Sequence, residues 1–185
     1  MATADDELFG AEHVRAYRES AGEHGYHWRG TTILLLTTTG RSSGEPRTTP
    51  LIHRTDAGRW VIVASKGGAP ENPGWYENLK ADPQATIEVL GEEIPVLAST
   101  ASGDERARLW SLMAEVWPAY DDYQGKTDRE IPVVVLTRRL PAGLTARPRP
   151  AGPGACRESR PGCSAPTGCR ARLAGAGRPL PANGR

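Results

Sequence analysis

The sequence predicts a mainly β protein with flanking helices (α+β), in which a largely antiparallel sheet curls into a small barrel. The predicted elements follow the order α, β, β, β, α, β, β, α, β along the chain. The predicted strands are rich in β-branched and aliphatic residues, as in TTILLLTTT at 31–39. Short hairpin-like connections dominate, and these join antiparallel neighbours.

The first half of the chain is predicted to hold one helix and three strands. Residues 5–21 favour a helix, with acidic residues near the start and a ragged apolar stripe made of Leu8, Phe9, Val14 and Tyr17. The following stretch to residue 30 is predicted to be loop. Strands are expected at 31–39, 48–54 and 59–65, separated by turns at Gly40–Gly44 and Asp56–Gly58.

A glycine-rich loop, KGGAPENPGW, leads into the second predicted helix. Asn72 is the expected N-cap, and Pro73 the first helical residue, where its missing N–H is harmless. The helix carries Trp75, Tyr76 and Leu79 and should end near Asp82-Pro83.

The second half of the chain adds two strands, a helix and a final strand. Residues 85–100 read as two strands around a turn at Gly91-Glu92. Ser102 and Glu105 have the spacing of a capping box at the start of the next helix. Its apolar stripe consists of Leu109, Leu112, Met113, Val116, Trp117 and Tyr120, and the last strand is expected at 131–136.

Charge and composition divide the chain. Residues 138–185 hold ten Arg and one acidic residue, Glu158, which leaves 13 basic and 21 acidic residues in 1–137. The tail is rich in Arg, Pro, Gly and Ala and has no aromatic residue, so we expect it to be disordered. It is either a native basic tail or the product of a shifted reading frame. The expected organisation is an N-terminal helix and loop at 1–29, a folded domain at 30–137 and the tail at 138–185.

Several classes of protein are not expected. The three cysteines all lie in the tail, so the folded part has no disulfide, which suits a reducing cytoplasm. No apolar run approaches the roughly 20 residues of a spanning helix, and the acidic start is unlike a secretory leader. Binding of nucleic acid through the basic tail ranks last, because the folded part is acidic.

The first candidate site surrounds the turn GRSSGEPR. Arg41 and Arg47 flank Ser42 and Ser43, and two guanidinium groups beside hydroxyls and turn amides can bind phosphate or carboxylate. The alternative is a solvated hairpin turn.

The second candidate is the loop that begins Ser65-Lys66-Gly67-Gly68. Paired glycines let a ligand approach the backbone, Lys66 supplies a positive charge, and the following helix presents free N–H groups. The pattern matches neither a P-loop nor a dinucleotide fingerprint, so it predicts no nucleotide. The alternative is a flexible connection.

The third candidate is the aromatic row Trp117, Tyr120 and Tyr123, which Pro118 separates from the preceding helix. The row could form the wall of a pocket for a flat apolar substrate, with a phenol as proton donor. The alternative is core packing. His24 and His27 have no third ligand nearby in sequence, so no metal site is expected.

Three separated segments together resemble the deazaflavin-dependent nitroreductase and quinone reductase family. They are TTTGRSSGEPRTTPL at 37–51, ASKGGAPENPGWYENLKADP at 64–83 and WPAYDDYQGKTDREIPVVVL at 117–136. The resemblance implies a split β-barrel like those that bind FMN, here binding coenzyme F420, an 8-hydroxy-5-deazaflavin with a phosphate and an oligoglutamate tail.

The resemblance also implies site residues. Cofactor contacts are expected from Arg41, Ser42, Ser43, Arg47, Thr48, Thr49, Pro50, Val63, Ala64, Ser65, Lys66, Gly74, Trp75, Tyr76, Glu77, Asn78 and Tyr120. Tyr120 and Ser65 are the expected catalytic residues, and Trp117 and Tyr123 should shape the substrate pocket. We expect Arg41, Arg47 and Lys66 to converge on the anionic cofactor.

The function implied is hydride transfer from reduced F420 to a quinone, with Tyr120 or water donating the compensating proton. The alternatives are reduction of nitro compounds or activated enones, and a non-catalytic carrier of the deazaflavin or of a lipid. A cytoplasmic protein is expected, and weak peripheral contact of the N-terminal helix with a membrane stays open. The sequence does not indicate an oligomeric state.

Overall fold

The computed structural model describes residues 4–139. Its strands are β1 (His27–Trp28), β2 (Thr31–Thr39), β3 (Pro46–Asp56), β4 (Arg59–Val63), β5 (Gln84–Val89), β6 (Glu92–Thr100) and β7 (Val133–Arg138). Its α-helices are α1 (Gly10–Glu19), α2 (Gly74–Ala81), α3 (Gly103–Val116) and α4 (Ala119–Gly125), and short 3-10 helices lie at Ala4–Glu7 and Lys66–Gly68. The predictions for the tail from residue 140 onward lie outside the described residues.

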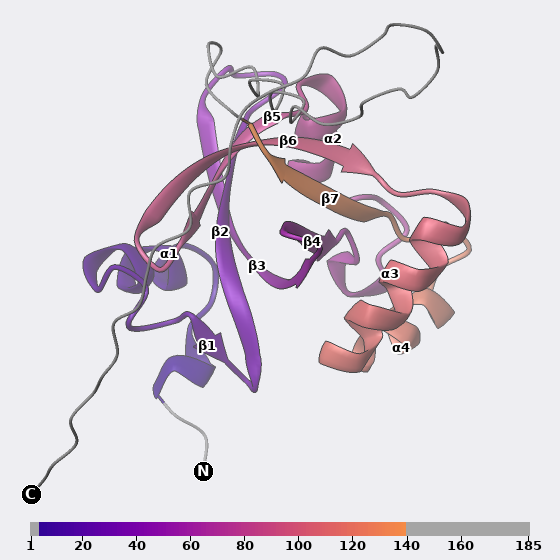
Figure 1. Cartoon of the computed structure of the whole chain (residues 1–185), viewed down its shortest axis with the longest axis horizontal. Coiled ribbons are helices and arrows are strands. Elements are labelled where there is room, and N and C mark those ends of the chain that lie inside the picture. The colour runs from indigo at the N-terminus through magenta and orange to yellow at the C-terminus, as the bar shows by residue number, and fades with distance from the viewer. Residues whose placement is uncertain (1–3, 140–185) are drawn as a thin grey trace, which may run out of the picture. The chain divides into compact units, whose positions relative to one another are not determined.

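Six strands close into an antiparallel barrel (Figure 1). Their order is β2-β3-β4-β7-β6-β5, and β5 pairs back onto β2. The long strand β3 pairs with two different strands along its length. Residues Pro46–His53 pair with β2, and residues Arg54–Asp56 pair with β4. This closed sheet with flanking helices confirms the predicted split-barrel fold class.

Strand β2 is buried on both faces at its centre, which explains the apolar run ILLL at 33–36. Leu34 and Leu36 point into the core of the barrel. Ile33 and Leu35 point outward and pack with Tyr17 of α1 in a second cluster. Each fully buried side chain of this size contributes roughly 1.5–3 kcal/mol, so the strand anchors the barrel and the N-terminal segment together.

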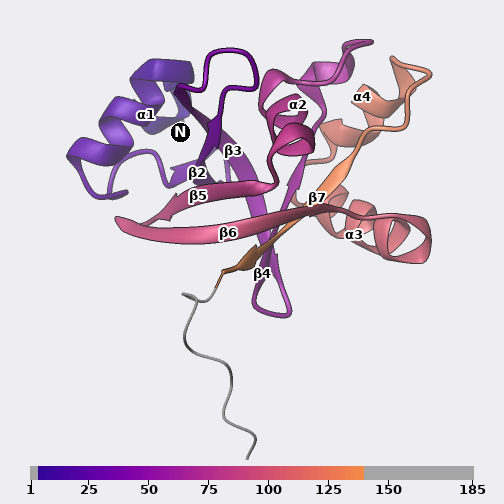
Figure 2. The same ribbon diagram turned by 90° about the horizontal axis from the view of Figure 1, so that it is seen from above.

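The helices cover different parts of the barrel. Figures 1 and 2 show α1 at one side, and α3 with α4 at the opposite side. Leu109 and Met113 of α3 pack on Val61 and Val63, the outward-facing residues of β4. Helix α2 contributes Trp75, Tyr76 and Leu79 to the barrel core.

Helix α1 is fastened to the barrel by polar contacts. The Tyr17 hydroxyl donates to the Ile33 carbonyl oxygen at 3.3 Å and accepts from the Leu90 backbone N–H at 3.0 Å. Arg18 forms a bidentate ion pair with Glu88 of β5, which is 9% exposed. None of the helices in residues 4–139 is long and apolar enough to cross a bilayer. The expected peripheral membrane contact of the N-terminal helix stays a prediction.

Three predicted segments differ in the structure: the N-terminal helix, the loop after it and the start of α2. The region 5–21 forms two helices rather than one, because Phe9 is extended between them. Residues 22–30 contain the short strand β1 instead of being all loop. Helix α2 begins at Gly74 with Pro73 as its N-cap. The Asn72 side chain does not cap it, because its amide group donates to Glu77 and accepts from Arg129.

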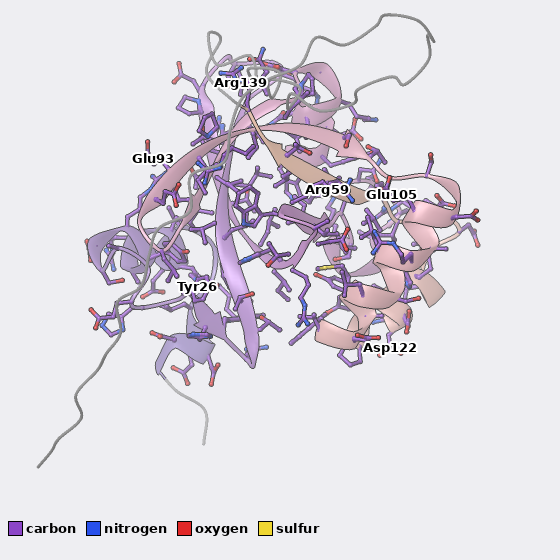
Figure 3. The ribbon with its side chains drawn as sticks, in the orientation of Figure 1. Tyr26, Arg59, Glu93, Glu105, Asp122 and Arg139 are labelled. Atoms are coloured by element: carbon purple, nitrogen blue, oxygen red, sulfur yellow. The ribbon has the colours of Figure 1, made fainter. Side chains whose placement is uncertain are left out.

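The expected capping box of α3 does not form. Ser102 is the N-cap, but its side chain makes no capping hydrogen bond. Glu105 instead accepts a hydrogen bond from Arg59 of β4 at 3.1 Å, and Figure 3 shows these two residues next to each other. The strand boundaries also move: β3 is longer than predicted, β4 ends two residues earlier, and β7 begins at Val133 rather than at residue 131.

Candidate active site

Two neighbouring cavities share Thr49 of β3 in their walls. We call them the basic cavity and the aromatic cavity, and each has a volume of about 340 Å³. The basic cavity lies between the turn after β2 and the start of α2. Its lining includes Arg41, Ser42, Ser43 and Arg47 on one side and Gly74, Trp75 and Asn78 on the other.

The two arginines of the basic cavity keep their charges available. Among residues 4–139, neither guanidinium group of Arg41 and Arg47 forms a hydrogen bond or ion pair. The pKa of Glu77 is lowered mainly by its hydrogen bond with Lys80 and also by the charge of Arg41. The turn itself is held in place, because the Arg41 backbone N–H donates to Asn78 Oδ1 at 3.1 Å. Asn78 Nδ2 in turn donates to Thr38 Oγ1 at 3.0 Å, so α2 and β2 position the turn together. A polyanion is the ligand that such a cavity can bind.

Lys66 is not brought together with these arginines. It lies outside the lining of both cavities, and its Nζ is 3.3 Å from Glu71 Oε2 in an exposed ion pair. Lys66 opens a 3-10 turn, and its φ of 47° lies in the left-handed region. Two of the three expected cations therefore converge, and the third faces its own loop.

The aromatic cavity lies between the N-terminal segment, β3 and α4. The predicted row contributes to it: Trp117, Tyr120 and Tyr123 all line the cavity, as do Ser65, Val63 and Pro50. The rings of Tyr120 and Tyr123 are 6.2 Å apart and nearly perpendicular. Tyr120 also packs in the core under α3, so the row serves both as core and as cavity wall. The two interpretations of this aromatic row, as pocket wall and as core packing, are therefore compatible.

The Tyr120 hydroxyl is free to act on a ligand. Tyr120 is 5% exposed, and no residue in the described part of the chain hydrogen-bonds its hydroxyl. Burial raises the pKa of Tyr120 well above its ordinary value of 10.0, and the nearby Tyr123 adds to this shift. The phenol is therefore a neutral hydrogen-bond donor and a weak acid.

Four other expected cofactor contacts lie outside the linings of the two cavities. The Thr48 hydroxyl is 2.8 Å from the Thr37 hydroxyl on the neighbouring strand. Ala64 and Tyr76 are part of the barrel core. Glu77 is 2.8 Å from Lys80 in an ion pair on α2. Contacts within the protein therefore explain the positions of these four residues, Thr48, Ala64, Tyr76 and Glu77.

Arg129 is a residue that the sequence analysis missed. From the segment before β7, its guanidinium donates to the carbonyl oxygens of Ala64 (3.2 Å), Ser65 (2.8 Å) and Ala69 (2.9 Å). It also donates to Asn72 Oδ1 at 3.0 Å. Burial lowers the pKa of Arg129. These four bonds hold the loop that carries Ser65, whereas the sequence shows Arg129 only as one charge in an acidic stretch.

Gly68 fixes the same loop against α4. Its φ is 84°, and a Cβ atom there would lie 2.6 Å from the carbonyl oxygen of Tyr123. The close approach that Gly68 allows is therefore to the protein's own backbone, not to a ligand. Gly67 does line the aromatic cavity, and its missing side chain leaves open space there.

The N-terminal segment also contributes to the aromatic cavity, which the sequence analysis did not predict. Leu8, Phe9, Gly10, His13 and Trp28 line it. The rings of Trp28 and Trp117 are 5.7 Å apart, so the segment meets the aromatic row across the cavity. No sequence motif in residues 1–29 indicates this role, because it depends on how α1 docks on the barrel.

Within residues 4–139, a cationic cavity that suits an anionic group thus lies beside an aromatic cavity that suits a flat apolar one. The chain belongs to the F420H(2)-dependent quinone reductase family, whose model matches residues 10–138. The resemblance seen in the three sequence segments is thereby confirmed.

Individual relatives agree with this assignment. An F420H(2)-dependent quinone reductase of Mycobacterium tuberculosis is 44% identical over 131 residues, which are 69% of this chain and 88% of that protein. A solved F420-H2 dependent reductase is similar with a TM-score of 0.54 and 42% identity, over 59% of this chain and 95% of that one. A solved domain-swapped dimer has a TM-score of 0.57 and 38% identity, over 68% and 92% of the two chains.

Proposed function

We propose that this protein transfers a hydride from reduced coenzyme F420 to a quinone bound in the aromatic cavity. The observation that carries the proposal is that Thr49 lines both cavities. One of them has two guanidinium groups with no hydrogen bond among residues 4–139, and the other has aromatic rings. Membership of the quinone reductase family supports it. A cytoplasmic location, expected from the cysteine-free folded part, belongs to the same proposal.

The basic cavity fits the anionic part of F420. Arg41 and Arg47 would pair with its phosphate and carboxylates, since neither has another partner in residues 4–139. The hydroxyls of Ser42 and Ser43 can donate to the same oxygens. Helix α2 begins at Gly74 in the cavity wall, and a helix N-terminus stabilises negative charge.

The aromatic cavity fits the acceptor. When bound, F420 supplies the hydride, and the protein orients the acceptor and excludes water. Tyr120 would donate a hydrogen bond to the acceptor oxygen, with Ser65 as a second donor on the same cavity wall. Because burial raises the pKa of Tyr120, the phenol stays neutral and keeps its hydrogen-bond donor, and either Tyr120 or a solvent water supplies the compensating proton.

An acceptor panel tests the proposal. The full chain is mixed anaerobically with reduced F420, and the return of the oxidised deazaflavin absorbance is followed with a naphthoquinone, a nitroaromatic compound and an enone. Fastest turnover with the quinone supports the proposal, whereas faster turnover of another acceptor selects one of the alternative reductases. Tight F420 binding without oxidation by any acceptor would indicate a carrier.

Tyr120→Phe should lower kcat/KM for the quinone about tenfold while the Kd of F420 changes less than twofold. One hydrogen bond in the transition state contributes about 1–1.5 kcal/mol, and the ring volume is retained. Because its pKa is raised, the contribution of Tyr120 should not vary between about pH 6 and 9.

Tyr76→Phe is the matched control for this variant. The Tyr76 hydroxyl is 3.1 Å from the Thr100 hydroxyl and lies outside both cavities, so its removal should leave kcat/KM unchanged. Equal rates for Tyr120→Phe and the unmodified chain with every acceptor would contradict the role of Tyr120.

A further inference from the structure

His13 of α1 is a buried polar residue in the wall of the aromatic cavity. It is 3% exposed, and its Nε2 lies 2.7 Å from the carbonyl oxygen of Gly25. A carbonyl oxygen only accepts hydrogen bonds, so Nε2 must carry the hydrogen. In the neutral imidazole the other nitrogen, Nδ1, is then an acceptor with a free lone pair.

The orientation of the imidazole ring is fixed. Gly25 has a φ of 86°, and a Cβ atom there would lie 2.8 Å from both Cδ2 and Nε2 of His13. The Cδ2–Nε2 edge is therefore pressed against the backbone of the turn before β1. A half-turn of the ring about the Cβ–Cγ bond would put Cε1 in the place of Nε2 and break the bond to Gly25, so Nδ1 stays on the edge away from the turn.

Nδ1 of His13 is left for a ligand. No residue in the range 4–139 hydrogen-bonds it, and it is not among the fully enclosed side-chain atoms that lack a partner. Nδ1 therefore keeps some accessible surface, and the cavity that His13 lines is the aromatic cavity. The lining of this cavity contains no Asp, Glu, Lys or Arg. An acceptor in such a setting destabilises the complex unless the ligand brings a donor.

Tyr120 and His13 add polar groups of opposite kind to a wall that also carries the hydroxyls of Thr49, Ser65 and Tyr123. The Tyr120 hydroxyl is a donor and suits an oxygen that accepts, whereas Nδ1 of His13 is an acceptor and suits a hydroxyl. A quinone has only accepting oxygens, but the hydroquinone formed from it has hydroxyl groups. The cavity therefore offers the reduced ring a contact that the oxidised ring cannot make.

We propose that His13 accepts, through Nδ1, a hydrogen bond from the hydroxyl group of an aromatic ring bound in the aromatic cavity. The ligand class is that of ring hydroxyl compounds, including the hydroquinone product and quinones that carry a hydroxyl. The proposal rests on the proposed function in taking this cavity as the acceptor site. It assigns to α1 a direct part in ligand selection.

A matched pair of stable ligands tests the proposal without the cofactor. Calorimetric titration of the full chain compares 1-naphthol, which has the hydroxyl donor, with 1-methoxynaphthalene, which has the same ring and oxygen but no donor. Naphthol should bind about 5- to 100-fold more tightly, because the methoxy compound leaves a buried acceptor unpaired. Equal affinities, or no binding of naphthol, would overturn the proposal.

His13→Gln separates the ligand contact from the structural one. A glutamine amide can still donate to the Gly25 carbonyl oxygen, and its amide oxygen, bonded to the same carbon as the amide nitrogen, does not take the position of Nδ1. The preference for naphthol should disappear in this variant while Tm changes little; a preference that persists excludes His13. If His13→Gln does not fold, Ser65→Ala and Thr49→Val decide: the naphthol preference should persist in both, and its loss in either would assign the contact to that hydroxyl and overturn the proposal.

Arg18→Gln is the control for loosening of α1. Arg18 lies on the same helix as His13, and this variant breaks its ion pair with Glu88 of β5. Arg18 is not part of the cavity lining. The naphthol preference should survive in this variant, and its loss there would overturn the proposal in favour of a purely structural effect. A missing preference in a chain that still reduces quinones overturns only this inference, whereas absent quinone reduction overturns the proposed function.

Discussion

Replacing Arg41 and Arg47 together with alanine should raise the Kd of F420 on the order of 10²–10⁴-fold. Both guanidinium groups line the basic cavity and have no partner in residues 4–139, so each can form a charge-assisted hydrogen bond with the cofactor. Each such bond contributes roughly 1.5–3 kcal/mol, and the double variant removes two. Barrel stability should change little, because both side chains are exposed.

Spectroscopic titration of F420 at two salt concentrations measures this effect. The unmodified chain should lose affinity as salt rises, and the double variant should lose much less, because screening acts on the interactions that it lacks. Arg54→Ala is the matched control: Arg54 is an exposed arginine of β3 that lines neither cavity, so its removal should leave the Kd within about twofold. An unchanged Kd in the double variant would show that the basic cavity does not bind the anionic part of F420.

Arg129→Met should lower Tm by about 8–16 °C and slow quinone reduction at least about tenfold. The variant leaves three carbonyl oxygens and the Asn72 side chain without the donor that holds them. Loss of these bonds destabilises the fold by about 2–4 kcal/mol, and one kcal/mol corresponds to about 4 °C in a domain of this size. Turnover falls because Ser65, in the aromatic cavity wall, is no longer held in position.

Thermal unfolding and steady-state kinetics measure the two effects separately. Arg129→Lys keeps the charge but cannot donate in four directions, so it should recover only a small part of the activity. Arg108→Met is the control for charge alone, because Arg108 is an exposed residue whose hydrogen bonds go to Asp56 and not to the loop that Arg129 holds. That variant should shift Tm much less. Normal turnover in a folded Arg129→Met protein would contradict the positioning role of Arg129.

The strands were predictable from the sequence because their residues satisfy a local rule. TTILLLTTT at 31–39 coincides with β2, since β-branched and aliphatic side chains fit a pleated strand buried on both faces. The turn at Asp56–Gly58 was predictable from Gly58, whose φ of 78° lies in the left-handed region that glycine readily adopts. Local residue preference and the tertiary fold agree at these positions.

The helix caps were less predictable, because their side chains have partners elsewhere. Glu105 has the capping-box spacing but pairs with Arg59, and Asn72 has cap chemistry but bonds Arg129, distant in sequence. Lys66 is similar: its charge suits an anion site, yet it pairs with Glu71. The spacing of residues along the chain indicates which local side-chain contacts are possible. Residues distant in sequence determine which of these contacts form.

By itself, the sequence determined the fold class, the family and the two arginines and aromatic row of the candidate site, because motif residues lie close together along the chain. Only the tertiary structure decided that Arg129 holds the Ser65 loop and that His13 reaches the aromatic cavity. The physical reason is chain separation. These contacts join segments tens of residues apart, and no local pattern records which segments meet when the barrel closes.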